Sequence, residues 1–305
     1  MKKIVYIGNS LSIHGLTPST LDNLKPKLED YFNVISSSTK KNKILRLFDM
    51  VFCVLLNRKS LDYVLIDTYS TSAFYYAFII GLLSKLFNLK YIAFLHGGDL
   101  PKRGERTPKL LDYFLSNAFK IISPSNYLVS KLKNNFPYDY QIIPNFMDIK
   151  NYPMNEKKYG DSINLFWLRS FHKIYNPKLA VEIVHKLKKL NYDVKLSMVG
   201  PDKDGSLNSC IEYAKKLNVF DSISFEGRLS KNNWIKISHN YNFFLNTTNV
   251  DNAPLSVVEA MALNFIVIST NVGGMPFLIE DKKEGLLVNP NDSDDFVEKI
   301  IYLNS

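Results

Sequence analysis

The stretch from Asn246 to Pro276 constrains the fold of this chain more than any other part. An apolar run, Tyr241 to Leu245, leads into it and predicts a strand that ends in a polar turn. Pro254 to Leu263 should follow as a helix, because proline suits a first helical turn and Asn252 can serve as the N-cap. The β-branched run 266–268 then predicts a second strand. Such a strand–turn–helix–strand unit is typical of parallel α/β sheets, and it presents free backbone N–H groups at their carboxyl edge, where anions bind.

Two carboxylates flank this turn, Asp251 before the helix and Glu259 within it, with seven residues between them. Ser256 adds a hydroxyl group in the first turn, and Gly273-Gly274 follows the second strand. This ordered set resembles the signature of family 4 glycosyltransferases, also called glycosyl transferases group 1. The sequence departs from that signature at Asp251, where the family usually has glutamate.

The resemblance implies an α/β fold of the GT-B type, with two Rossmann-like domains whose parallel sheets face each other across an interdomain cleft. We expect residues 1–150 to form the acceptor-side domain and residues 151–305 the domain that binds the nucleotide-sugar donor. A chain of 305 residues is long enough for two domains of ordinary size. The polar segment 148–162 is the expected linker. Relatives continue with further helices after the point corresponding to Ser305, so the second domain is expected to lack them.

The net charge of +9 indicates an anionic partner: a nucleoside diphosphate, an acidic lipid surface or a nucleic acid. No nucleic-acid-binding motif and no basic stripe with interleaved aromatic residues occurs, so we expect no nucleic-acid partner. Cys53 and Cys210 are single cysteines far apart in the sequence, which argues against a disulfide framework or a zinc cluster and fits a reducing compartment. The chain passes from Met-Lys-Lys directly into a strand, so we expect a cytoplasmic protein.

The segment 40–59 carries six basic residues and one acidic residue, Asp49. Its middle, 44–56, has apolar residues at helical spacing. Two interpretations stay open: a core-facing helix with a solvated basic end, or a surface helix that touches anionic lipid at the inner face of the membrane. The uncharged run 68–84 is short for a membrane span and predicts a buried helix instead.

In the first domain, His96 directly follows the expected strand 91–95 and precedes two glycines. This position is at the carboxyl edge of a parallel sheet, where ligands bind. The resemblance implies that His96 contacts the donor sugar and, less directly, that Gly97 lines the same site. Gly15 follows the first strand, and either it lets a ligand approach closely or it belongs to an ordinary loop.

In the second domain, Arg169 and Lys173 follow the expected strand 163–168. This basic pair suits a diphosphate, since arginine binds oxygens bidentately and lysine acts as a point charge. The resemblance gives both residues the task of stabilising the leaving nucleoside diphosphate, together with the N–H groups near Leu255 and Ser256.

The resemblance also implies roles for four further residues of the second domain. Glu259 would hold the ribose hydroxyl groups, and Asp251 would contact the donor sugar. The backbone of Gly227 and Arg228 would border the nucleobase.

Asp202 and Asp204 are spaced like a metal site, but the proline and glycine around them are typical of a tight turn. We therefore expect no metal and no cofactor. The resemblance implies metal-independent transfer of a sugar, with retention of anomeric configuration, from a UDP- or GDP-linked donor to a hydroxyl group of a saccharide or lipid-linked acceptor. The resemblance also leads us to expect a role in cell-surface polysaccharide or glycolipid synthesis. Two alternatives stay open: a GT-B sugar-nucleotide epimerase and a catalytically silent member that binds sugar nucleotides.

Overall fold

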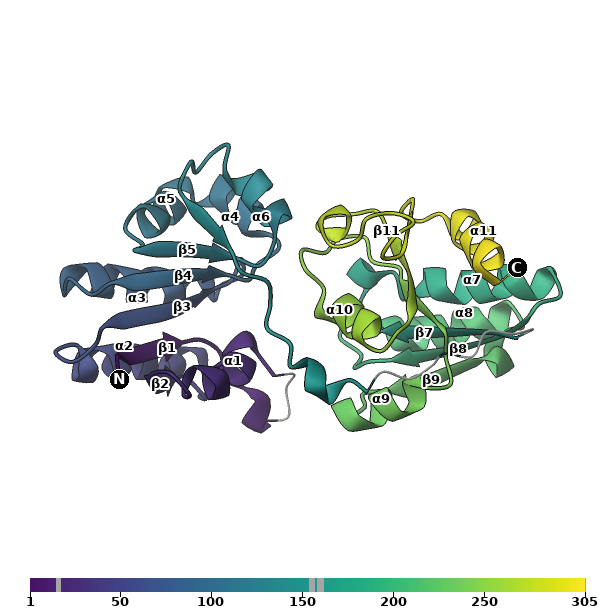
Figure 1. The fold of residues 1–305 in the computed structure, drawn as a ribbon, viewed down its shortest axis with the longest axis horizontal. Coiled ribbons are helices and arrows are strands. Elements are labelled where there is room, and N and C mark those ends of the chain that lie inside the picture. The colour runs from purple at the N-terminus through teal and green to yellow at the C-terminus, as the bar shows by residue number, and fades with distance from the viewer. Residues whose placement is uncertain (15–17, 154–156, 158–161, 305) are drawn as a thin grey trace. The chain divides into compact units, whose positions relative to one another are not determined.

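The computed structural model describes residues 1–14, 18–153, 157 and 162–304. The chain divides into two compact units, 1–147 and 148–305, hereafter unit 1 and unit 2. Each unit holds a six-stranded, all-parallel sheet with helices packed against it (Figure 1). The predicted class, two Rossmann-like parallel α/β folds, is therefore confirmed.

The sheet of unit 1 has the strand order β2-β1-β3-β4-β5-β6. The strands are β1 Lys3–Ile7, β2 Asn33–Ser37, β3 Tyr63–Thr68, β4 Tyr91–Leu95, β5 Lys120–Ser123 and β6 Tyr140–Ile142. The helices are α1 Thr20–Leu28, α2 Lys43–Asn57, α3 Phe74–Leu86, α4 Leu100–Arg106, α5 Pro108–Ser116 and α6 Asn126–Leu132. Sequence analysis missed β2, a half-exposed edge strand with only a short apolar run.

One face of the unit 1 sheet packs against helices α2, α3 and α5, which bury a shared apolar cluster. A smaller cluster on the other side joins α1 to side chains of β1 and β3. Alternate residues of a strand point to opposite faces, so β1 supplies Val5 and Ile7 to the first cluster and Ile4 and Tyr6 to the second.

The sheet of unit 2 has the strand order β12-β11-β10-β7-β8-β9. The strands are β7 Ser162–Leu168, β8 Asp193–Val199, β9 Ile223–Gly227, β10 Phe243–Asn246, β11 Ile266–Thr270 and β12 Leu286–Val288. The helices are α7 Pro177–Lys189, α8 Ser206–Lys216, α9 Lys231–Ser238, α10 Leu255–Ala262 and α11 Ser293–Asn304. Two 3-10 turns matter for the site: η2 Ile149–Asn151 and η3 Lys173–Tyr175.

The strand–turn–helix–strand unit forms as predicted, from β10 through α10 to β11, but Asn252 is not the N-cap. Helix α10 starts at Leu255, and its N-cap position is the extended Pro254, which makes no side-chain cap. The backbone of this turn lies close to the glycine pair after β11: the Gly274 amide donates to the carbonyl oxygen of Asp251 at 3.0 Å, and a Cβ on Gly274 would lie 1.6 Å from the carbonyl oxygen of Asn252.

Two other helix ends follow from the type of residue at them. Asn264 adopts the left-handed conformation after α10, with φ of 61°. Ser125 caps α6, where its hydroxyl oxygen accepts a hydrogen bond from the Leu128 amide.

The described part of the expected linker packs onto unit 2. Tyr152 is 4% exposed, and its ring lies against Trp234 of α9. Lys157 is also buried, and its ammonium group donates to the carbonyl oxygen of Ser238. Residues 148–153 therefore belong structurally to the second unit.

Candidate active site

The carboxyl ends of β7 and β10 mark the point where the strand order of unit 2 reverses. The chain runs from β7 outward to β8 and β9, whereas β10 returns to pair with the other side of β7. Ligands of open α/β sheets bind at such a switch point. Arg169 follows β7, and the loop that carries Asp251 follows β10, so the topology places both residues at this edge.

Arg169 forms an ion pair with Asp251, and both side chains are largely buried, at 16% and 13% exposed. The guanidinium group also lies over the ring of Tyr175, 4.4 Å from its centre. Burial lowers the pKa of Arg169, while the nearby Tyr175 and Glu259 act in the opposite direction. An arginine stays protonated in such a setting, so the site holds a buried cation. Sequence analysis assigned Arg169 and Asp251 to different parts of the donor and missed their pairing.

A layer of buried hydroxyl groups holds the loop between β10 and Asp251. The Trp167 indole N–H donates to Thr247 Oγ1 at 3.0 Å, and that hydroxyl donates to the carbonyl oxygen of Tyr175 at 2.9 Å. Thr270 Oγ1 donates to the carbonyl oxygen of Thr248 at 2.6 Å. Because these bonds tie three chain segments together, the loop that carries Asp251 has a fixed geometry without a ligand.

Several hydrogen-bonding groups at this edge have no partner among the described residues. Arg169 Nε and Ser256 Oγ are buried and form no hydrogen bond within the part of the chain that the structure describes. In the same described part, the amides of Leu255 and Ser256 at the start of α10 are also without an acceptor. Buried polar groups are nearly always paired in native proteins, so these donors indicate a site for an anionic or hydroxyl-bearing ligand.

Glu259 lies one turn into α10 and is 14% exposed. Its Oε1 accepts a hydrogen bond from the Tyr152 hydroxyl at 2.5 Å and lies 3.9 Å from the Lys231 ammonium group. Lys231 also lies over the Tyr152 ring, 4.3 Å from its centre. Burial raises the pKa of Glu259, although Tyr152, Lys231 and Arg169 each favour the ionised carboxylate.

Sequence analysis missed Tyr152 and Lys231. Tyr152 stands 107 residues before Glu259, and neither residue belongs to a recognisable motif. The aromatic Trp234, three positions after Lys231 on α9 and packed on Tyr152, is the one local signal that could have linked the two segments.

Lys173 begins η3, four residues after Arg169. Its amide donates to Asp204 Oδ2 at 3.0 Å, but its side chain is exposed, and its ammonium group makes no ion pair or hydrogen bond with the described residues. Asp202 Oδ1 accepts from the Gly205 amide at 3.0 Å, so both aspartates cap backbone N–H groups, as a turn requires. Within the described ranges, His, Cys, Asp and Glu side chains form no group of three or more that could hold a metal ion.

Gly227 ends β9 with φ of 63°, and its carbonyl oxygen accepts from the Gly200 amide at 2.7 Å. Arg228 follows it and is exposed. The place of Gly227 and Arg228 beside a nucleobase stays a prediction.

In unit 1, His96 follows β4, and its Nε2 donates to Asp67 Oδ1 at 2.8 Å. Asp67 is completely buried and also accepts from the hydroxyl groups of Tyr6, at 3.0 Å, and Tyr69, at 3.3 Å. Three donors on one carboxylate fix the orientation of the imidazole and leave its Nδ1 for another partner. Sequence analysis identified His96 but missed Asp67.

Of the predicted glycines of unit 1, Gly97 is buried against Ser70, whose amide would lie 2.5 Å from a Cβ at this position. This contact within the fold accounts for glycine there. Gly15 lies outside the described residues.

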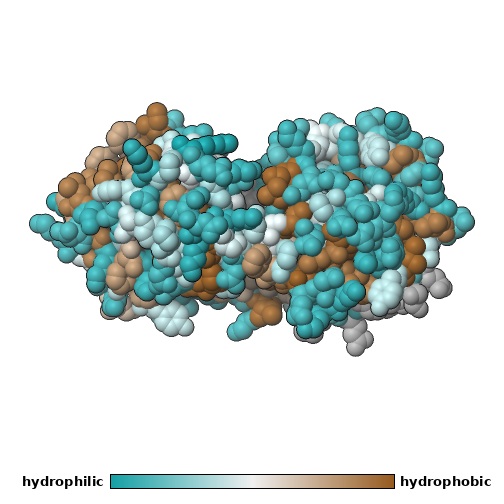
Figure 2. Space-filling model, turned by 90° about the horizontal axis from the view of Figure 1, so that it is seen from above, coloured by the Kyte–Doolittle hydropathy of each residue, from teal (hydrophilic) through white to brown (hydrophobic). Residues whose placement is uncertain are grey.

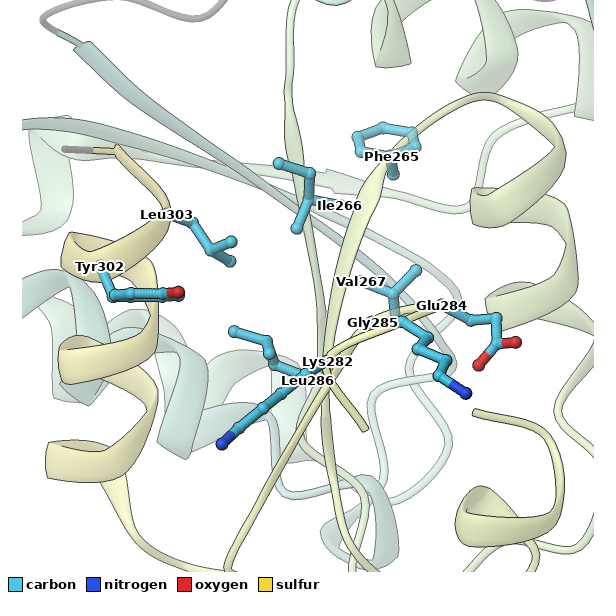
Figure 3. A pocket seen from close by; sticks show the side chains of 10 residues that line it. Phe265, Ile266, Val267, Lys282, Glu284, Gly285, Leu286, Tyr302 and Leu303 are labelled. Carbon is cyan, nitrogen blue, oxygen red and sulfur yellow. The ribbon is translucent and has the colours of Figure 1, made fainter. Parts of the chain in front are cut away.

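A cavity of about 410 Å³ opens elsewhere in unit 2, at the amino-terminal ends of β11 and β12 (Figure 3). Side chains from the start of β11, from the turn before β12 and from the end of α11 line it, among them Phe265, Leu286 and Tyr302. Arg169 and Asp251 follow the carboxyl ends of the strands, so this cavity is separate from the candidate active site.

The family model for glycosyl transferases group 1 matches residues 148–305, just over half of the chain. The chain therefore belongs to this family, as its sequence motifs predicted.

Among its relatives, an uncharacterized glycosyltransferase of Methanocaldococcus jannaschii is 28% identical over 225 residues, which cover 73% of this chain and 60% of the relative. The capsular polysaccharide biosynthesis glycosyltransferase CapH of Staphylococcus aureus is 24% identical over 310 residues, 89% of this chain and 82% of CapH. The crystal structure of Anabaena HepE in complex with UDP matches with a TM-score of 0.73 and 14% identity, covering 98% of this chain and 89% of HepE. The chain thus has the GT-B fold, and it spans about 60% of the length of the archaeal relative.

Proposed function

We propose that the protein is a glycosyltransferase that moves a sugar from a nucleoside diphosphate sugar, with UDP or GDP as the nucleotide, to a hydroxyl group of an acceptor. Support comes from membership of the family and from the unpartnered donors beside the Arg169–Asp251 pair. HepE, which shares the fold, is seen in complex with UDP. CapH, by its name, serves capsular polysaccharide biosynthesis, which favours a cell-surface saccharide or a lipid-linked saccharide as the acceptor.

The chemical task is to break the bond between an anomeric carbon and a diphosphate that leaves with growing negative charge. We propose that Arg169, the amides of Leu255 and Ser256, and the Ser256 hydroxyl group bind these phosphate oxygens. The α10 dipole, whose positive end lies at Leu255, would add to this stabilisation. Lys173 would supply a further cation, since its exposed side chain is not engaged by the described residues.

The remaining roles follow from the family resemblance. Glu259 would hold the ribose hydroxyl groups, because a carboxylate one turn into α10 can reach back to a ligand at the start of the helix. Asp251 and His96 would contact the donor sugar, and transfer would proceed with retention and without a metal ion. Gly227 and Arg228 would border the base.

The test combines a binding screen with a product assay. UDP and GDP are compared for protection against thermal unfolding, and radiolabelled UDP- and GDP-sugars are incubated with the protein and a saccharide acceptor. Transferred or hydrolysed sugar supports the proposal. Arg169→Ala should be about 10²–10³-fold slower, and the exposed Arg106→Ala should be fully active as its control. An epimerised donor, or binding without any turnover, would instead identify one of the two alternatives.

A further inference from the structure

Helix α2 exposes an apolar stripe to solvent on the side that faces away from its sheet. Arg46, Met50 and Val54 are the residues that it buries. The exposed residues lie on the opposite side of the helix and are Ile44, Leu45, Phe48, Phe52 and Leu56. Four of these residues are spaced four positions apart and therefore lie on one face of the helix: Ile44, Phe48, Phe52 and Leu56. An outer helix of a soluble α/β unit ordinarily carries polar residues on this face.

Helix α3 extends the exposed apolar area. It packs beside α2, and both helices cover the same face of the unit 1 sheet. Leu82 and Leu86 are exposed on α3, and Phe87 follows them, with the Arg58 guanidinium group 5.3 Å from its ring centre. The prediction that the run 68–84 forms a buried helix is thus wrong for one face of this helix. In the view of Figure 2, hydrophobic residues lie together along one edge of unit 1, and others lie on the surface of unit 2.

Exposed cations flank the stripe at both ends of α2: Lys40, Lys41 and Lys43 before it, Arg58 and Lys59 after it. The buried Arg46 fixes the first group, because its guanidinium donates to the carbonyl oxygens of Lys40 and Lys41. Segments 40–60 and 68–98 contain a single acidic residue, Asp49, which accepts a hydrogen bond from the Ser37 hydroxyl. The surface is therefore apolar at its centre and basic at its rim.

We propose that this α2–α3 surface docks the protein onto an anionic lipid bilayer. The apolar helical face matches the hydrocarbon interior of such a membrane, and the lysines at its edges match the anionic headgroups. Among the described residues, no helix is long and apolar enough to cross a bilayer, so the helices lie on the membrane instead of spanning it. The inference is independent of the proposed function, since docking is measured without a donor or an acceptor.

The test is co-sedimentation with vesicles of phosphatidylcholine alone and of phosphatidylcholine mixed with phosphatidylglycerol. We expect binding to the anionic vesicles, weaker binding at high salt, and little binding to the neutral ones. The double variant Phe48→Ser/Phe52→Ser should bind at least tenfold more weakly; both residues are more than half exposed, at 54% and 56%, so the fold should persist. The matched control Ile149→Ser/Leu190→Ser removes exposed apolar residues from unit 2 and should bind like the unmodified protein.

Charge is tested separately with the triple variant Lys40→Gln/Lys41→Gln/Lys43→Gln. A lysine near an anionic surface adds roughly fivefold to the affinity, so this variant should lose most of its binding. The control Lys189→Gln/Lys203→Gln/Lys216→Gln removes the same charge from exposed positions of unit 2.

Three results would overturn the proposal: equal binding to neutral and anionic vesicles, full binding by both α2 variants, or no vesicle binding at all. If the protein does not bind vesicles, sedimentation velocity is used to look for a dimer. A dimer that is lost in Phe48→Ser/Phe52→Ser would identify the surface as a contact between copies of the chain.

Discussion

Tyr152 donates its hydroxyl hydrogen to Glu259 Oε1 at 2.5 Å, which joins the first turn of unit 2 to the helix at its candidate active site. The bond occupies one oxygen of the carboxylate that we propose for binding ribose. It also favours the ionised form of Glu259. Burial acts in the opposite direction and raises the pKa of this carboxyl group.

Tyr152→Phe should therefore raise the pKa of Glu259 further, because the variant removes a donor to the carboxylate. If ribose binding needs the ionised form of Glu259, both proteins should lose UDP affinity as the pH falls. Tyr152→Phe should lose it at a higher pH than the unmodified protein. Calorimetric titration with UDP from neutral to acidic pH measures this shift. The partly exposed Tyr175→Phe removes a hydroxyl near Arg169 without touching Glu259 and serves as the control. Superimposable pH profiles of Tyr152→Phe and the unmodified protein would contradict the expectation.

Glu259→Gln should stabilise the fold while weakening nucleotide binding. The pKa of Glu259 is raised in the folded protein, so at neutral pH the ionised carboxylate makes folding less favourable, and this cost disappears as the pH falls below the folded pKa. The variant should thus have the higher Tm at neutral pH, and the difference should shrink on acidification. Thermal unfolding at several pH values, with the exposed Glu105→Gln as control, measures it. A lower Tm of Glu259→Gln at neutral pH would mean that the Tyr152 and Lys231 contacts outweigh burial.

Local patterns predicted the elements that carry the site but not the partners of its side chains. The run from β10 to β11 and the left-handed Asn264 follow from short-range preferences that need no knowledge of the rest of the chain. The Arg169–Asp251 pair forms because β10 lies beside β7 in the sheet. Nothing in the sequence between these two strands indicates that they are neighbours. Strand order, not residue type, decides that contact.

The surface of α2 illustrates a second limit. Apolar residues occupy nearly every face of 44–56, so helical spacing predicts the helix but does not tell which side meets the sheet. Burial of Arg46 decides it: its three hydrogen bonds to Asn9, Lys40 and Lys41 hold one face inward and leave Phe48 and Phe52 in solvent.

Asp67→Asn should reduce turnover about tenfold without changing UDP affinity. Asp67 orients the His96 ring, and we propose that His96 contacts the sugar and not the nucleotide, so only the reacting complex should be affected. Single-turnover rates and UDP titrations measure the two effects. Tyr6→Phe removes a different donor to the same carboxylate but keeps the His96–Asp67 contact, so its rate should fall less than that of Asp67→Asn. A fall in UDP affinity of Asp67→Asn would place the effect on the fold instead.

Transfer should persist in excess EDTA. The expectation rests on the donors that would neutralise the diphosphate, above all Arg169, and on the engagement of Asp202 and Asp204 with backbone amides. Activity is compared before and after chelation, and after adding back Mg²⁺ or Mn²⁺. Loss on chelation with recovery by either ion would require a metal in the mechanism, and Asp204→Asn would then show whether this turn binds it.

The Arg169–Asp251 pair leads to the last prediction, because a diphosphate and Asp251 compete for the same guanidinium group. Asp251→Asn leaves a buried cation without its partner, and breaking such a pair costs roughly 3–5 kcal/mol of folding free energy. The variant should therefore melt at a lower temperature when empty but bind UDP more tightly, so that UDP raises its Tm more than it raises that of the unmodified protein. Arg169→Ala should show the opposite binding effect and lose about 10²–10³-fold in turnover. Combining both substitutions measures their coupling, with Arg106→Ala as the charge control. If UDP raises the Tm of Asp251→Asn and of the unmodified protein equally, Asp251 does not restrain Arg169, and the pair has no part in donor binding.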